Sequence, residues 1–560
     1  MQKNKQMQKN KRQNVKNVRS VIRQTVTGYA GLSLGIVLAV AGAIVTALLP
    51  PWILGSIVDT ITAGNVVPVA LVILYFAFTV LTGLTESIRE GLLTVFGQKI
   101  THALRSSMME KYTNLTAGEL TKQEPGTIVS RFVGDVDTVE NLFTSGIISM
   151  FADACKIISI LVVIWLKNRG LAIVLLILLP FLYWFTRTVQ KNMLKAQIEN
   201  RRAVGRASGH VPETLHNIRT IHTLGKERYM EQRYDEYIAE SYRAVDRTNF
   251  YDAIYSPVIL ILNAIVVAVV MLFSASGNAK VLTLFGMSAG TAVAVINYIS
   301  QIFTPVESLG MEIQTIQSAI AGVHRINEFY ALEELPERVR NLETPVVTEE
   351  ETPFVELQNV TFSYEDDDRK ILQALNFQVY PGEQVTLSGR TGAGKSTVFK
   401  LLLGLYQPGE GKVLIQGRDA FQIPENEKRS LYGYVEQTFH RVPGTVKDQI
   451  TLYDDSFTME EVRGAARIAG LDATIEQLEK GYDTLCTSEI FSQGQWQLLS
   501  IARAIAAGPQ ILLLDEITAN LDAGTEQTVL DALQCAGQNR TVVSISHRLY
   551  NRTGGRSIEI

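Results

Sequence analysis

Six apolar stretches in the N-terminal part of this chain limit its possible folds more than any other feature. They cover residues 28–50, 67–88, 145–166, 170–190, 255–275 and 286–306. An α-helix rises about 1.5 Å per residue, so about 20 apolar residues cross the ~30 Å hydrocarbon core of a bilayer. The six stretches therefore predict an all-α domain of six membrane-spanning helices.

The segment before the first stretch is basic, as it is in a signal peptide. We nevertheless expect this stretch to be retained, because its apolar run is long, no small-residue cleavage site follows it, and further spans come after it. Cations beside a span favour the cytoplasmic side. Those before the first span are Lys3, Lys5, Lys9, Lys11, Arg12, Lys16, Arg19 and Arg23. Residues 1–15, which contain the repeat MQKNK, are expected to be a solvated tail, with a surface helix on anionic lipid as the alternative.

With the N-terminus inside, six spans return the chain to the cytoplasm. The connections 89–144 and 191–254 are then cytoplasmic, and their helical periodicity and mixed charges indicate that membrane helices continue into them. Glu86, Arg89 and Glu90 fall near the inner end of the second span. We predict no midspan chain of Asp, Glu or His, which disfavours a proton-driven transporter and calls for another source of energy.

Composition divides the remaining chain into domains. A chain of 560 residues is too long for one core. The predicted parts are a basic tail and entry helix at 1–27, a six-span domain at 28–330, an acidic, proline-containing linker at 331–353, and an α/β domain at 354–560. The net charge of −4 gives no reason to expect nucleic acid. The three cysteines are far apart in sequence and are expected to be idle thiols.

The α/β domain contains a phosphate-binding loop in its N-terminal part. At 385–405 an apolar strand, a glycine-rich loop and an apolar-periodic helix follow one another, and the loop has the pattern GxxxxGK[ST]. Backbone N–H groups of such a loop surround phosphates, Lys395 reaches the β- and γ-phosphates, and the Ser396 hydroxyl holds Mg²⁺. The nucleotide-binding residues predicted here are Gly389, Arg390, Thr391, Gly392, Ala393, Gly394, Lys395, Ser396 and Thr397.

Two later strands end in polar residues. The buried strand 511–514 precedes Asp515, expected in the Mg²⁺ shell, and Glu516, expected to polarise the attacking water. The alternative for this pair is a purely structural role as a helix cap. The presence of the phosphate loop makes this interpretation the weaker one. The strand 541–546 leads to His547, expected at the sheet edge that binds ligands, in contact with the γ-phosphate.

The order of these motifs resembles the nucleotide-binding domain of ABC transporters, over essentially all of residues 354–560. The resemblance implies that ATP and Mg²⁺ bind here. It makes His547 the switch histidine, Glu516 the catalytic carboxylate and residues 520–522 the D-loop. It makes Tyr364 the residue that stacks on adenine and Gln437 the Q-loop glutamine, which contacts Mg²⁺ or water. It also places the ABC signature at Ser492, Gly494 and Gln495.

The first half is similar, more loosely, to the six-span exporter domain of the same family. Residues 124–140 and 213–227 resemble its two cytoplasmic loops, whose short helices meet the nucleotide domain. Two features depart from the family pattern. The signature begins Phe491-Ser-Gln493, where Leu-Ser-Gly or Leu-Ser-x is usual. Residues 482–490 lack the glutamate-containing segment of many exporters. The second departure puts the usual contact with the cytoplasmic loops in doubt.

The resemblance implies an ATPase that drives export of an unidentified cargo (amphipathic, lipid-like, drug or peptide) across the cytoplasmic membrane, with the nucleotide domain in the cytoplasm. Two nucleotide domains sandwich two ATP molecules in this family, so a second half-transporter is required. A homodimer is favoured, because one chain carries the complete set of motifs, and a heterodimer stays open. An ATP-gated membrane sensor without transport is the alternative from another class. The six spans disfavour a soluble ABC protein, and the fused order disfavours an importer.

Overall fold

A computed structural model describes residues 17–274, 288–335, 352–364, 369–390, 392–515, 523–545 and 555–560. The chain forms two compact units. The helical unit contains Met1–Thr113 and Glu124–Leu332, and the α/β unit contains Asn114–Gln123 and Glu333–Ile560. The predicted fold class, a helical domain followed by an α/β domain, is confirmed. The basic tail to Lys16, with its repeat, and most of the predicted linker lie outside the described residues.

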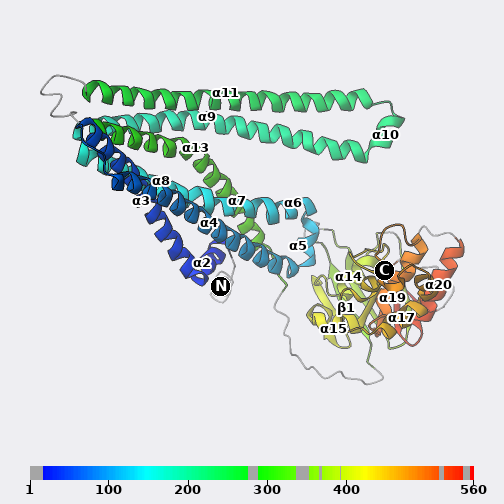
Figure 1. Cartoon of the computed structure of the whole chain (residues 1–560). Coiled ribbons are helices and arrows are strands. Elements are labelled where there is room, and N and C mark those ends of the chain that lie inside the picture. The colour runs from blue at the N-terminus through cyan, green and yellow to red at the C-terminus, as the bar shows by residue number, and fades with distance from the viewer. Residues whose placement is uncertain are drawn as a thin grey trace, which may run out of the picture. The chain divides into compact units, whose positions relative to one another are not determined.

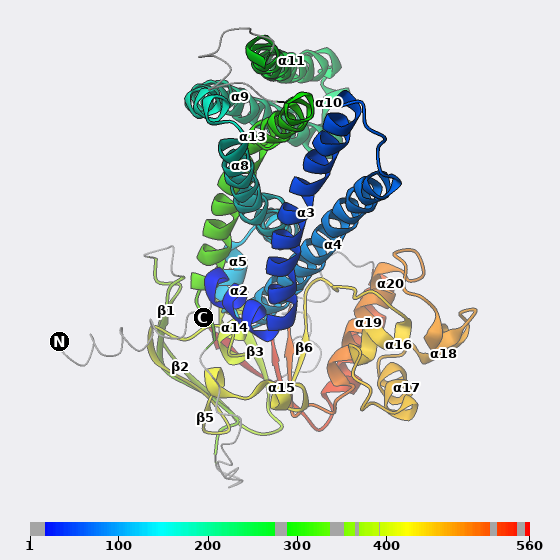
Figure 2. The same ribbon diagram turned by 60° about the vertical axis from the view of Figure 1, so that its left-hand side comes forward.

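The helical unit consists of long helices (Figure 1). They are α2 (Val18–Gly28), α3 (Ala30–Thr62), α4 (Val69–Thr113), α6 (Pro125–Ser130), α7 (Val136–Asn141), α8 (Ile147–Lys167), α9 (Arg169–His216), α10 (Ile218–Thr223), α11 (Glu227–Ser274) and α13 (Ala289–Ala331). Two π-helical segments, η1 (Arg131–Asp135) and η2 (Leu142–Gly146), join α6, α7 and α8. Two long antiparallel pairs, α3 with α4 and α9 with α11, lie side by side in both views (Figures 1 and 2).

Helix α13 packs against α3 and α8, and at one point its backbone approaches that of α3 closely. A Cβ atom added to Gly290 would lie 1.9 Å from the Gly55 carbonyl oxygen. At the same place the Asp59 carboxylate accepts hydrogen bonds from the Gly290 N–H and the Ser288 hydroxyl, each at 2.7 Å. Asp59 therefore caps the first turn of α13, and only glycines allow the two helices to lie this close.

Helices occur at all six predicted spans, but four of the described ones are both long and apolar enough to cross a membrane: Ala30–Thr62, Val69–Thr113, Pro125–Lys167 and Glu227–Val269. The predicted fourth span lies in α9. The sixth lies in α13, whose apolar part, Ala289–Phe303, is shorter than the stretch predicted. Helices α4, α9 and α11 run on without a break beyond their spans, which confirms that the membrane helices continue into the polar connections.

The charged residues of the spans are more numerous than those singled out from the sequence. Arg89 and Glu86 form an ion pair in α4. Asp153 and Lys156 lie in α8, inside the predicted third span, and are both partly buried. Neither was singled out from the sequence, although an acid and a base three residues apart in an apolar run are unusual in a membrane span.

The α/β unit contains two sheets. Its strands are β1 (Val355–Phe362), β2 (Leu372–Val379), β3 (Gln384–Ser388), β4 (Glu410–Ile415), β5 (Arg418–Asp419), β6 (Tyr432–Val435), β7 (Ile511–Leu514), β8 (Thr541–Ser544) and β9 (Arg556–Glu559). Its helices are α5 (Ala117–Lys122), α14 (Lys395–Leu402), α15 (Glu425–Leu431), α16 (Val446–Thr451), α17 (Met459–Ile468), α18 (Asp472–Glu476), α19 (Gln493–Ile505) and α20 (Ala523–Gly537), with the 3₁₀ turns η3 (Ala420–Gln422) and η4 (Gly481–Asp483).

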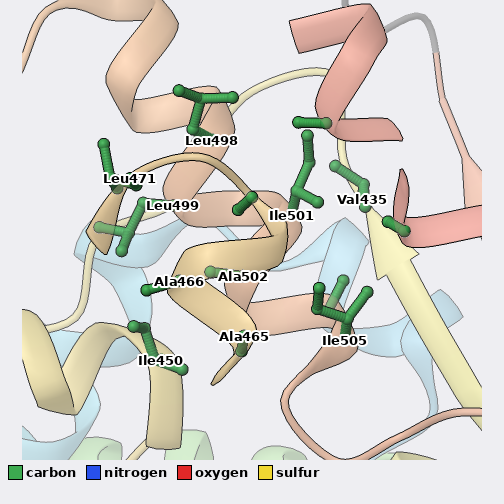
Figure 3. Packing of buried hydrophobic residues seen from close by; sticks show 14 of the residues in the cluster. Val435, Ile450, Ala465, Ala466, Leu471, Leu498, Leu499, Ile501, Ala502 and Ile505 are labelled. Carbon is green, nitrogen blue, oxygen red and sulfur yellow. The ribbon is translucent and has the colours of Figure 1, made fainter. Parts of the chain in front are cut away.

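The first sheet has the order β2-β1-β4-β5 and antiparallel pairs, and the second has the order β6-β7-β8-β3-β9 and parallel pairs. Parallel strands are usually covered on both faces and read as continuous apolar runs. Strand β7 fits this rule, because all four of its residues are buried. One core cluster lies around β1, β3 and α14, and a second lies around α17, α19 and α20. Figure 3 shows the second, in which Leu498, Leu499 and Ile505 of α19 pack among their neighbours.

Candidate nucleotide site

The parallel sheet brings several of the predicted site segments to one edge. Strands β6, β7, β8 and β3 are neighbours and run in the same direction. In the sequence, Gln437 follows the carboxyl end of β6 and Asp515 follows that of β7. The segment that leads to His547 follows β8, and the loop from Gly389 follows β3. Ligands bind in open α/β sheets at this edge. The fold thus places segments more than a hundred positions apart, such as those from Gly389 and Asp515, at the same edge of the sheet.

The loop from Gly389 has the backbone geometry of a phosphate cradle. Gly389, Gly392 and Gly394 have φ values of 147°, 85° and 100°, which L-residues with side chains rarely adopt. A Cβ atom on Gly394 would also lie 2.7 Å from a methyl carbon of Leu372. Alternation of such backbone conformations turns successive N–H groups toward one point, where they can hold an anion.

Lys395 and the start of α14 add positive charge at the same place. The Lys395 ammonium donates hydrogen bonds to the carbonyl oxygens of Gly389 and Arg390, at 2.9 and 3.1 Å, so it lies across the loop. Helix α14 begins at Lys395, and its N-cap, Gly394, has no side chain to satisfy the first-turn N–H groups. Those N–H groups and the exposed Ser396 hydroxyl therefore fit a phosphate and a hard cation.

Tyr364 is held against α14 by polar and aromatic contacts. Its hydroxyl lies 3.2 Å from the Thr397 hydroxyl and accepts a hydrogen bond from the Lys400 ammonium at 3.3 Å. Its ring meets the Tyr406 ring edge to face, with centroids 5.5 Å apart. The Tyr406 hydroxyl in turn lies 3.5 Å from that of Thr121 in α5. The predicted adenine-stacking residue is thus placed beside the phosphate loop.

Asp515 has a neighbour that sequence reasoning missed. The backbone N–H of Asp515 donates to the Val435 carbonyl at 3.0 Å, and its carboxylate accepts a hydrogen bond from the Tyr434 hydroxyl. Burial, and next the negative charges of Asp515 and Glu436, raise the pKa of Tyr434 above its ordinary value. Tyr434 therefore stays a neutral donor that orients the predicted metal-binding carboxylate. The sequence signal was its place one residue before the end of the strand β6.

The predicted signature residues begin helix α19. The Ser492 hydroxyl accepts a hydrogen bond from the Gln495 N–H at 3.4 Å, and the Gln495 side chain accepts one from the Ser492 N–H at 2.8 Å. This reciprocal pair is a capping box. Gly494 is buried, and a Cβ atom there would lie 1.9 Å from the Thr525 methyl carbon. Phe491 is buried as well, so the unusual first residue of the signature belongs to the core.

The structure does not bring the whole predicted set together within one chain. Among the described residues, no hydrogen bond joins 492–495 to 389–397. Gln437 is exposed, and its carbonyl oxygen accepts a hydrogen bond from the Gln497 side chain at 2.9 Å. Four predicted site elements lie outside the described residues: Thr391, Glu516, residues 520–522 and His547.

Two family models match the chain in the order of its two units. The model described as the ABC transporter transmembrane region matches residues 32–306, and the one described as ABC transporter matches residues 372–519. Together they cover more than half of the chain.

Individual relatives match nearly the full length. An uncharacterized ABC transporter ATP-binding protein, YfiC of Bacillus subtilis (strain 168), is 28% identical over 96% of this chain and 89% of its own. An ATM1-type heavy metal exporter of Novosphingobium aromaticivorans is 29% identical over 90% of this chain and 83% of its own. The solved structure of a bacterial Atm1-family ABC exporter with ATP bound has a TM-score of 0.75 and 25% identity, and covers 97% of this chain and 94% of its own.

These matches confirm the family, the fold class and the coarse activity inferred from the motifs. The chain binds ATP, spans a membrane several times and works as one half of a dimer. It therefore belongs to the ABC transporters, as an exporter-type half-transporter whose ATPase is coupled to transport.

Proposed function

We propose that two copies of this chain form an ATP-driven exporter of the cytoplasmic membrane, and that each ATP is bound between the phosphate loop of one copy and the signature helix of the other. The observation that carries this proposal is that one chain supplies both a phosphate cradle, at Gly389–Ser396, and a separate capped helix start at Ser492. Two copies then provide two complete sites without a second gene product.

At each site the residues of one copy bind and orient the nucleotide. Tyr364 stacks on adenine, and Lys395 and the N–H groups of 389–397 hold the phosphates. Ser396, Asp515 and Gln437 fit Mg²⁺, because they offer the hard oxygen ligands that this ion prefers. When bound there, Mg²⁺ neutralises charge on the phosphates.

The remaining residues act on the water and on the γ-phosphate. Glu516 accepts a proton from the attacking water, and His547 contacts the γ-phosphate. The partner subunit's signature serine and first-turn N–H groups add donors, together with the positive end of α19. Because these contacts exist only when the copies close on each other, ATP shifts the population toward the closed form, and hydrolysis releases it.

Closure is proposed to open the transmembrane domain outward, and the cargo is proposed to be amphipathic. Hydroxyls in the spans bond mainly within the protein, as in the pair Thr46–Thr85 at 2.9 Å and the pair Thr186–Tyr255 at 3.1 Å. In contrast, the Gln301 side-chain oxygen of α13 is buried without a partner among the described residues. A buried acceptor in an otherwise apolar span supports a cargo with both an apolar part and a polar donor.

Glu516→Gln tests the catalytic part of this proposal. The variant should bind ATP as the wild type does, and its hydrolysis rate should fall by about 10²–10⁴-fold, because the proton acceptor is lost while the phosphate contacts remain. Equilibrium ATP binding and phosphate release from the purified chain in lipid nanodiscs measure the two quantities. Wild-type turnover in this variant would show that Glu516 is not the base.

Transport into inside-out vesicles tests the rest. The chain expressed alone should take up amphipathic fluorescent substrates in an ATP-dependent manner, and Glu516→Gln vesicles are the matched control. Dimerisation or hydrolysis that needs a second polypeptide would favour the heterodimer. Hydrolysis without movement of any substrate in a broad panel would favour the membrane sensor.

A further inference from the structure

Three aromatic rings join the Q-loop to the start of the signature helix. The indole of Trp496, in the first turn of α19, stacks on the Phe439 ring with centroids 5.3 Å apart and planes 23° apart. It also contacts the Phe491 ring, edge to face, with centroids 5.1 Å apart and planes 90° apart. The guanidinium carbon of Arg441 lies 5.6 Å from the centre of the Trp496 ring. Phe439 lies two residues after Gln437, and Phe491 lies one residue before Ser492. The stack thus connects the two motifs expected to meet ATP.

Polar contacts reinforce the same connection. Arg503 donates to the His440 carbonyl oxygen at 2.9 Å, and its guanidinium carbon lies 4.2 Å from the centre of the Phe439 ring. Gln497 donates to the Gln437 carbonyl oxygen at 2.9 Å. Helix α19 therefore contacts three of the four residues from Gln437 to His440 along its length.

The stack lies at the margin of the core rather than inside it. Phe491 is buried with 5% of its surface exposed, whereas Trp496 and Phe439 are only partly buried against the second core cluster. Leu499, Ile501 and Ala502 of α19 are fully buried there. These residues anchor the helix in the core. The aromatic rings are therefore not needed to anchor it and can instead fix the position of its first turn.

On its other side the first turn of α19 has no room to move. Gly494 is already so close to Thr525 of α20 that a Cβ atom would overlap it. With α20 on one side and the ring stack on the other, the position of Ser492 depends on the Q-loop of its own chain.

We propose that Trp496 is a positioning residue that couples the Q-loop of each copy to the signature serine it presents to the partner's ATP. This inference rests on the proposed function, because it requires the composite sites described there. It gives a role to the unusual signature of this chain: Phe491 replaces the usual leucine because it forms the edge contact with Trp496. ATP bound beside Gln437 in one site then sets the signature geometry of the other site.

Turnover of matched variants tests the coupling. Trp496→Leu should lower kcat for ATP hydrolysis about tenfold, as expected when two aromatic contacts of a positioned group are lost, and should leave ATP affinity measured without Mg²⁺ unchanged. Trp496→Phe keeps a ring on Phe439 and should restore kcat to within about threefold of wild type.

Two controls separate positioning from a loss of folding. Phe457→Leu removes another partly buried ring from the same core cluster. The Phe457 ring contacts the guanidinium of Arg429 in α15, so its loss should leave kcat unchanged. Phe439→Leu removes the shared ring contact from the other side and should also lower kcat. The double variant should be faster than the product of the two single effects predicts, because both single variants lose the Trp496–Phe439 contact. Additive effects, or a loss in Phe457→Leu equal to that in Trp496→Leu, overturn the proposal.

Fluorescence gives a readout that needs no turnover. Trp496 is the only tryptophan after residue 184, so the full chain with W52F, W165F and W184F reports on it alone. ATP with Mg²⁺ should change the Trp496 emission of the Glu516→Gln chain, and Phe439→Leu should remove that change. Emission unaffected by ATP overturns the coupling even if the ATPase and transport are intact, whereas loss of transport with an intact fluorescence response counts only against the proposed function.

Discussion

Ser492 caps α19 in this structure and is proposed to contact the partner's ATP, and the substitution that separates these two roles can be chosen from its geometry. It caps α19 through its hydroxyl, and it is exposed, as a residue that meets a partner must be. Gly494, by contrast, is buried against Thr525, so any side chain at that position would displace the helix before it touched a nucleotide. Substitution of Gly494 by aspartate is therefore a poor test of the signature, because steric overlap and charge act together.

Ser492→Asp is the cleaner test. Aspartate is as good an N-cap as serine, so the helix start should be kept, while its carboxylate repels the partner's γ-phosphate. We expect ATP hydrolysis to fall by at least about tenfold, with unchanged ATP binding by the phosphate loop and an unfolding temperature within a few degrees of wild type. Hydrolysis at the wild-type rate in this variant would show that Ser492 does not belong to the ATP site.

Cys486 provides a prediction about pH. Burial raises the pKa of its thiol to about 11 from an ordinary value of 9.0, against the opposing effect of Arg441 and Arg503. An acid whose pKa is higher in the folded state stabilises the fold below its unfolded pKa. This contribution is therefore complete below pH 9 and is lost as the pH rises through about 11.

The reactivity of Cys486 follows from the same shift. At pH 8 its thiolate is scarce, so iodoacetamide should alkylate it at least about tenfold more slowly than the exposed Cys535, which is the internal control. Mass spectrometry of the two peptides over time measures both rates in one sample. Equal rates would mean that the segment around Cys486 opens readily.

At the scale of single residues, the sequence predicted the parts of the site that are local in the chain. The glycines and the lysine of 389–396 lie in one loop, so their pattern alone indicated their geometry. Tyr434 and Trp496 were missed because their roles arise from contacts across the fold, with Asp515 and with Phe439, and no local pattern encodes those.

At the scale of elements, an ion pair between a half-exposed arginine and a buried carboxylate joins two parts of the helical unit. Arg325 of α13 donates to both carboxylate oxygens of Asp135 in η1, at 2.9 and 3.0 Å from its Nε. The Asp135 side chain is 7% exposed, so it depends on this partner. Nearby, Arg105 of α4 pairs with Asp137 at 2.7 Å, but both of those side chains are about half exposed.

The two pairs give matched variants. Arg325→Met should destabilise the chain by about 1–3 kcal/mol, because it leaves a buried carboxylate without its main donor. Arg105→Met should cost less than about 1 kcal/mol, as exposed pairs do. Thermal unfolding in detergent compares them, and the larger fall in midpoint should belong to Arg325→Met. Equal falls would mean that water reaches Asp135 freely.

Element positions were predictable from hydropathy, but element ends were not. The spans predicted from apolar length coincide with helices, whereas α9 and α11 continue far into polar sequence. Length and apolarity locate a membrane crossing, but a helix ends where its backbone groups find other partners, and polar helical sequence gives it no reason to stop at the membrane surface. The two π-helical segments on either side of α7 left no signal in the sequence pattern.

At the scale of the whole molecule, the central claim is that two copies of this chain share their ATP sites. Two lesions distinguish shared from private sites: Lys395→Ala in the phosphate loop and Ser492→Asp in the signature. If sites are shared, a dimer with one lesion on each copy has both lesions in the same site and keeps the other site intact. A dimer with both lesions on one copy has one lesion in each site, so neither of its sites is intact.

Retention of ATP by such mixed dimers is the most direct measurement. The copies carry different affinity tags and the Glu516→Gln change, which stops hydrolysis, and dimers with both tags are isolated and assayed for ATP retained after gel filtration. The account predicts that the dimer with the lesions on separate copies retains ATP, because one of its sites can close on the nucleotide. The dimer with both lesions on one copy should not retain it, because ATP held by a phosphate loop alone dissociates during gel filtration. The reverse pattern would mean that each chain binds ATP with its own signature, and would contradict the account.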